Sequence, residues 1–200
     1  MPDHLPRSLS RDKIVAVGLD MVNQRGADAL TMRGLAQALG VTPMAIYNHF
    51  DDKRDLLRTI ADHVITSVDF DGGHSDWQRQ LRHCFTALRD TCLRNPALPR
   101  LLEIEGAAPA SALAPMRVAV AALDRAGLSE TDSLRTFFLL VGFTLSQAAY
   151  QLRGPFPDLD PTRGPQAITL SAEWDFDAGF DHGITLITEG VIAMVKREKD

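Results

Sequence analysis

Apolar residues recur three and four positions apart in almost every segment of this 200-residue chain, and no segment alternates convincingly between apolar and polar residues. The first spacing places side chains along one face of an α-helix, whereas alternation would indicate a β-strand. Glycine and proline interrupt the pattern at short intervals, which favours several separate helices. The chain is therefore predicted to be all-α, with about nine helices.

Cap residues mark the boundaries of four helices in the N-terminal third. Ser10 precedes the first helix and Gly26 follows it, as expected for residues that favour helix starts and ends. Thr31 and Gly40 bound the second helix in the same way, and Asp51 or Asp52 caps the fourth. The predicted helices cover residues 11–24, 32–39, 43–50 and 52–68.

The second and third of these helices are separated only by the tight turn Gly40–Val41. Thr42 and Pro43 then begin the third helix abruptly, because a proline at the first helical position gives up no hydrogen bond. In a helix-turn-helix protein, one helix crosses the DNA backbone and the next enters the major groove. The spacing predicts such a motif, with Ile46 and Phe50 turned inward.

The remaining residues of this motif have side chains that suit contacts with double-stranded DNA. The Asn48 amide can bind adenine through two hydrogen bonds, and Met44 and Ala45 can contact thymine methyl groups. Arg33 can reach a guanine edge or a phosphate. The side chains suited to phosphate contacts are those of Thr31, Thr42, Tyr47, His49 and Lys53. Tyr47 and His49 could each equally be a packed or solvated residue.

The stretch GADALTMRGLAQALGVTPMAIYNHFDDKRDLL, residues 26–57, resembles the tetracycline-repressor (TetR) family. The resemblance covers residues 10–68 well and residues 77–198 more faintly. It implies a transcriptional regulator that binds a palindromic operator and responds to a small molecule. Repressor is the commoner mode in that family, while an activator differs only in operator position. The DNA contacts that the resemblance implies are Arg33, Thr42, Pro43, Met44, Ala45, Tyr47, Asn48, His49 and Lys53.

Changes in composition along the chain divide it into four parts. Residues 1–9 are predicted to form a flexible arm, and residues 10–68 the DNA-binding domain. Residues 69–76 contain two glycines and no helical period, which is typical of a linker. Residues 77–200 are predicted to form a larger helical domain for ligand binding and dimerisation.

Two helices of the larger domain indicate a homodimer. Residues 134–153 are apolar nearly all round, and a helix of this kind must be buried on every face. The last helix, 175–197, carries an apolar stripe that includes Gly183 and Gly190, and small residues allow close helix approach. Two such helices from each chain would form a four-helix interface. Alternatively, the stripe packs into the core of its own chain.

A pocket for a small apolar or amphipathic effector is predicted between helices 77–94, 110–125 and 134–153. Thr144 and Gln147 are the polar groups best placed to orient such a molecule. Residues of these types on helices are more often ordinary core residues than ligand contacts. The candidate lining residues are Phe85, Leu88, Cys92, Met116, Val120, Phe138, Phe143, Thr144 and Gln147.

Other classes of protein fit less well. No phosphate-binding glycine loop or hydrolase motif occurs, and the six histidines lack metal-ligand spacing, so neither an enzyme nor a cofactor is expected. The net charge of −5 shows that DNA binding must depend on where the charges lie. Cys84 and Cys92 are too far apart on one helix to form a disulfide, which fits the cytoplasm. No apolar run is long enough to cross a membrane. A helical binding module without DNA function would explain the C-terminal half but not residues 31–53.

Overall fold

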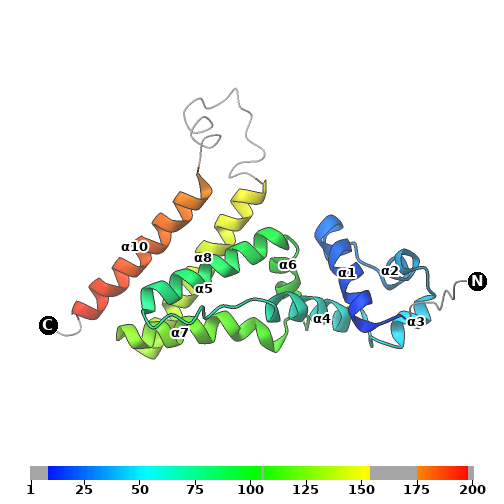
Figure 1. Cartoon of the computed structure of the whole chain (residues 1–200), viewed down its shortest axis with the longest axis horizontal. Coiled ribbons are helices and arrows are strands. Elements are labelled where there is room, and N and C mark those ends of the chain that lie inside the picture. The colour runs from blue at the N-terminus through cyan, green and yellow to red at the C-terminus, as the bar shows by residue number, and fades with distance from the viewer. Residues whose placement is uncertain (1–8, 105, 154–174, 198–200) are drawn as a thin grey trace, which may run out of the picture. The chain divides into compact units, whose positions relative to one another are not determined.

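The computed structural model describes residues 9–104, 106–153 and 175–197, and within them the chain is all-helical, as predicted (Figure 1). The predicted arm, apart from Leu9, and the whole of the proline-rich stretch 154–169 lie outside these residues. The helices are α1 (Arg11–Arg25), α2 (Met32–Leu39), α3 (Pro43–Tyr47), α4 (Lys53–Thr66), α5 (Trp77–Arg94), α6 (Leu98–Glu103), α7 (Ala114–Ala126), α8 (Glu130–Arg153) and α10 (Phe176–Arg197), with a 3₁₀ helix at Ala110–Leu113.

The chain divides into two compact units that do not follow the order of the sequence. The first combines residues up to Ser67 with Asn95–Ala112, and the second combines Val68–Arg94 with the residues from Leu113 onward. The sequence predicts 95–112 within the C-terminal domain, whereas its contacts group it with the N-terminal unit. Helix α6 packs on α4, and the side chains of Asn23 and Asn95 are hydrogen-bonded at 3.2 Å.

In the first unit, α1 packs against α2 and α4, and α2 against α3. The predicted caps are present, because Ser10, Thr31 and Thr42 each accept a hydrogen bond from a backbone N–H three residues later. Asp52 is the residue that caps α4. The fully buried side chains that these helices share include Ile14, Leu35, Ile46, Phe50, Leu56 and Ile60.

In the second unit, α5 packs against α7 and α8, and α10 packs mainly against α8. The predicted linker 69–76 is an ordered turn here. The Asp69 carboxylate accepts hydrogen bonds from the backbone N–H groups of Asp71 and Gly72, which lower its pKa, and Phe70 is buried. Helix α7 begins at Ala114, four residues later than the predicted start at 110, and Pro115 lies in its first turn.

Phe143 of α8 packs directly against Gly183 of α10. A Cβ atom at Gly183 would overlap the Phe143 ring, which stacks on Phe180 with 5.5 Å between centroids. The predicted apolar stripe of α10 is therefore partly the core of its own chain, because Phe180, Ile184 and Val191 are buried there.

Gly183→Ala should lower the free energy of unfolding by about 1–3 kcal/mol, because the added methyl group displaces a packed ring. In a Phe143→Ala background the same change should be neutral or stabilising by up to about 1 kcal/mol, since alanine has the better helix propensity. Urea unfolding of the four variants of this cycle measures the coupling. Equal effects of Gly183→Ala in both backgrounds would show that the two residues do not interact.

Candidate DNA-binding and effector sites

The α2–α3 turn holds the short helix α3 at a fixed angle. Gly40 ends α2 with φ +68°, a left-handed conformation that favours glycine. Thr42 then caps α3, and Pro43 takes its first position. Ile46 and Phe50 are 0% and 1% exposed beneath the helix, so the opposite face of α3 is turned to solvent.

The solvent face of α3 carries most of the predicted DNA-contacting residues. Met44 and Tyr47 are 69% and 47% exposed, and Thr42, Pro43 and Asn48 are also exposed. Ala45 and His49 are half-buried, which differs from the predicted exposure of Ala45. The structure thus brings five of the predicted residues to one face.

The other three predicted residues flank α3. Thr31 and Arg33 are exposed at the start of α2, where the Thr31 hydroxyl accepts a hydrogen bond from Gly34 N at 3.0 Å. Lys53 is half-buried as the first residue of α4, and its Nζ donates to the carbonyl of Asp28 at 3.3 Å. This bond uses one of the three N–H donors of the Lys53 ammonium.

Arg11 is a residue that the sequence analysis missed. Its guanidinium donates to the carbonyl of His49 at 2.7 Å and to the Thr59 hydroxyl at 3.0 Å, and its carbon Cζ lies 4.3 Å from the centroid of the Phe50 ring. One side chain thus ties the first turn of α1 to the end of the recognition helix and to α4. The position of Arg11 could have indicated a special role. A cation in the first turn of a helix is unfavourable with respect to the helix dipole, so it needs another reason to be there.

The predicted effector residues do not all lie together. Phe85, Leu88 and Cys92 are buried on α5, and Met116 and Val120 are half-buried on α7. Phe138 is 65% exposed, because the helical phase of α8 turns its neighbour Phe137 toward Phe85 instead, with 6.3 Å between ring centroids. Phe143, as described above, packs on α10. Phe137 is the aromatic core residue that the sequence pattern missed.

Thr144 and Gln147 have buried polar atoms without a hydrogen-bond partner: Oγ1 of the first and Oε1 of the second. Other buried threonines of this unit behave differently, because Thr91 and Thr188 donate to backbone carbonyls of their own helices at 2.6 and 2.9 Å. A buried polar group without a hydrogen-bond partner costs free energy. Its presence indicates that a ligand or a water molecule can supply the partner.

Neither cysteine is placed for chemistry. Burial raises the pKa of Cys84 and Cys92 to about 12, and both are free thiols. The reactive form of cysteine is the thiolate, so both thiols are inert at neutral pH. The described residues contain no group of His, Cys, Asp or Glu side chains arranged to hold a metal ion. None of the described helices combines the length and apolar character that crossing a bilayer requires.

These features define a helix-turn-helix protein with a second, larger helical unit, and comparisons with known proteins agree. Residues 14–60 match the family described as "Bacterial regulatory proteins, tetR family". The tetracycline repressor protein class C of Escherichia coli is 27% identical over 93% of this chain and 92% of its own length.

Two solved structures show the same fold over nearly the whole chain. A possible TetR family transcriptional regulator from Streptomyces coelicolor A3(2) is 28% identical, with a TM-score of 0.75 over 92% of this chain and 100% of that one. The TetR family protein ActR of Streptomyces coelicolor, in complex with (S)-DNPA, is 27% identical, with a TM-score of 0.67 over 92% and 98%. Residues 14–60 thus match the family model of tetR regulators, and over nearly its whole length the chain is similar to transcriptional regulators of that family.

Arg11→Ala should weaken binding to every DNA sequence several-fold, because it loosens the recognition helix without touching a base-reading side chain. It should also lower the free energy of unfolding by about 1 kcal/mol, the usual size of a hydrogen bond plus an exposed cation–π contact. Arg58→Ala is the matched control, because within the described part of the chain Arg58 bonds only to Asp55, at 2.6 Å. Mobility shifts and urea unfolding measure both quantities. Equal effects of the two changes would remove the special role of Arg11.

Proposed function

We propose that this regulator is a repressor that binds a palindromic operator as a homodimer and is released by a small-molecule effector. The observation that carries the DNA-binding part is the solvent-facing side of α3, where base-reading and phosphate-binding side chains gather over the buried Ile46 and Phe50. A regulator of this kind acts where the chromosome is, so the cytoplasm is its proposed location.

A mobility-shift selection from a random palindromic library tests the proposal and supplies the operator. Dimers of helix-turn-helix proteins read half-sites about 34–36 Å apart, so the selected sequence should be a palindrome with that spacing or a multiple of it. Recovery of no preferred sequence would argue against operator recognition by this chain.

The proposed dimer contact is the outer face of α8 and α10. Leu139 and Leu186 are 58% and 59% exposed there, and with Gly190 and Met194 they line an open apolar groove of about 470 Å³. Phe138, 65% exposed, lies on the same helix. Exposed apolar groups of this density mark interaction surfaces, and a second copy of the same two helices would cover them in a four-helix arrangement.

The proposed effector site lies among α5, α7 and α8, where Thr144 and Gln147 hold their unmet acceptors. Structures of ActR contain (S)-DNPA or actinorhodin, which shows that this fold can hold small molecules. The ligand must bind the DNA-free arrangement better than the DNA-bound one, because a ligand with no such preference shifts nothing. By linkage, the operator then weakens ligand binding by the same factor.

Base-reading and phosphate-binding residues should differ in their effects. Asn48→Ala should cost about 1–3 kcal/mol on the selected operator and relax the preference at one base pair. Lys53→Ala should weaken all sequences similarly and reduce the salt slope by about one. Titrations at several salt concentrations on operator and scrambled DNA separate the two. Operator binding that is unchanged in Asn48→Ala would rule out base reading by this residue.

Gly190→Trp should convert the dimer to monomers or aggregates, because nothing lies within 4 Å of a Cβ at this position in one chain and the indole would fill the proposed contact. Glu189→Trp is the matched control, since Glu189 lines a different, polar pocket beside Arg82. Light scattering at micromolar concentration reports the state of each variant. A monomeric wild-type protein would contradict the dimer proposal.

A further inference from the structure

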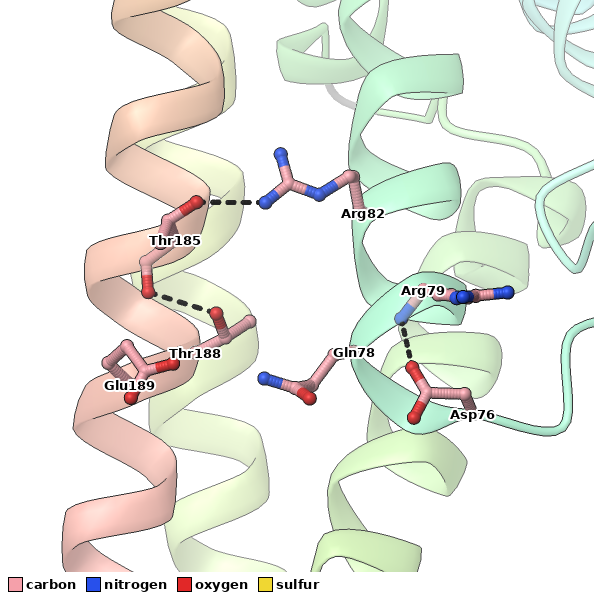
Figure 2. A pocket seen from close by; sticks show the side chains of 7 residues that line it. All are labelled: Asp76, Gln78, Arg79, Arg82, Thr185, Thr188 and Glu189. Carbon is pink, nitrogen blue, oxygen red and sulfur yellow. Dashed lines mark hydrogen bonds between the residues drawn. The ribbon is translucent and has the colours of Figure 1, made fainter.

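Two arginines of α5, two helical turns apart, reach across to α10. Figure 2 shows the first, Arg82, at a polar pocket of about 350 Å³, with its guanidinium directed at Thr185. Arg82 is 41% exposed, donates to Thr185 at 2.9 Å and pairs with Asp181 at 2.6 Å. Arg82 and Asp181 form an ordinary surface ion pair, of a kind that contributes little to stability.

The second, Arg89, is in a different environment. Its side chain is only 5% exposed, and its Cζ lies 4.9 Å from the centroid of the Phe180 ring. A single nitrogen, Nη2, donates both to Asp177, at 2.7 Å, and to Gln151, while Nε is buried without any acceptor. A buried charge is costly unless its hydrogen bonds are complete. The guanidinium of Arg89 therefore lacks one hydrogen-bond acceptor, at Nε.

The ion pair does not explain the burial of Arg89. The Asp177 side chain is 81% exposed, and one of its oxygens bonds to one nitrogen of the guanidinium. An arginine binds a carboxylate best through two parallel hydrogen bonds, and its Nε–Nη2 edge offers such a pair. Asp177 leaves half of that edge unused.

An unmet acceptor belongs to the helix that faces Arg89. Gln151 of α8 accepts from Arg89, and Gln147 lies one turn before it on the same face, with its Oε1 buried and unpaired. Thr144 is three residues further back and also has no partner. Facing helices thus hold a free donor on α5 and free acceptors on α8.

We propose that the effector is an acid, and that its carboxylate binds the Nε–Nη2 edge of Arg89 in place of Asp177 while a hydroxyl or N–H of the same molecule donates to Gln147. This inference rests on the proposed effector site and adds the chemical class of its ligand. The exchange keeps the site neutral, because one carboxylate replaces another. Asp177 is exposed and is rehydrated when it leaves.

The probes are 3-hydroxybenzoate, 6-hydroxy-2-naphthoate and 6-hydroxyanthracene-2-carboxylate, whose hydroxyl can donate to Gln147, and each is compared with its primary amide by calorimetry on the full chain. The amide has nearly the same shape but no charge. At least one acid should bind ten-fold or more tightly than its amide. That preference should vanish in Arg89→Gln and persist in the surface control Arg82→Gln. Acid and amide forms that bind alike in all three pairs would overturn the proposal, as would a preference that survives Arg89→Gln.

Asp177→Asn supplies a gain that poor folding cannot imitate. Removing the competing carboxylate should tighten the acid several-fold and leave the amide unchanged, whereas no gain would show that Asp177 does not occupy the ligand's place. Operator mobility shifts separate this inference from the proposed function. Acid binding through Arg89 that leaves the operator bound would uphold the anion site and remove ligand control. Release of the operator by a neutral ligand, independent of Arg89, would uphold ligand control and overturn the anion site.

Discussion

The DNA-binding half depends on the burial of Ile46 and Phe50. Helix α3 has five residues, far fewer than an isolated helix needs to be stable in water. Its conformation must therefore come from packing, and two fully buried side chains supply about 1.5–3 kcal/mol each. Because both anchors lie on one side of the helix, the other side is fixed in its orientation. The exposed residues of this short helix are therefore held rigidly by the two buried side chains and do not themselves have to be buried.

Local signals were sufficient to predict this half from the sequence. Ser10, Thr31 and Thr42 act through backbone groups three residues away, and Gly40 is required by its own φ, so each can be recognised without knowledge of distant contacts. Arg11 was missed because its partners lie 38 and 48 residues further along the chain. No periodicity encodes which carbonyl a guanidinium will reach.

The larger unit was less predictable because its helices are apolar on more than one face. In α8, Phe137 and Phe138 are adjacent, and the sequence gives no means to choose the one that faces α5. In α10, the sequence left open whether the stripe meets a partner chain or its own core, and Phe180, Ile184 and Val191 are buried within this chain. Leu186 and Met194 remain exposed. Hydrophobic spacing identifies buried faces but does not say which surface buries them.

The assignment of Asn95–Ala112 to the first unit offers a physical route for control by a small molecule. The chain passes between the units after Ser67, after Arg94 and after Ala112, so the end of α5 and the approach to α7 continue directly into a segment packed with α4. That segment is held partly by polar contacts, such as Asn23 with Asn95 and Arg100 with Asp28 at 3.5 Å. The exposed ion pair contributes about 1 kcal/mol or less, and the part-buried hydrogen bond about 1 kcal/mol. A ten-fold change in operator affinity requires only about 1.4 kcal/mol. The free energy needed for release is therefore of the same size as the contacts that hold this segment within the first unit.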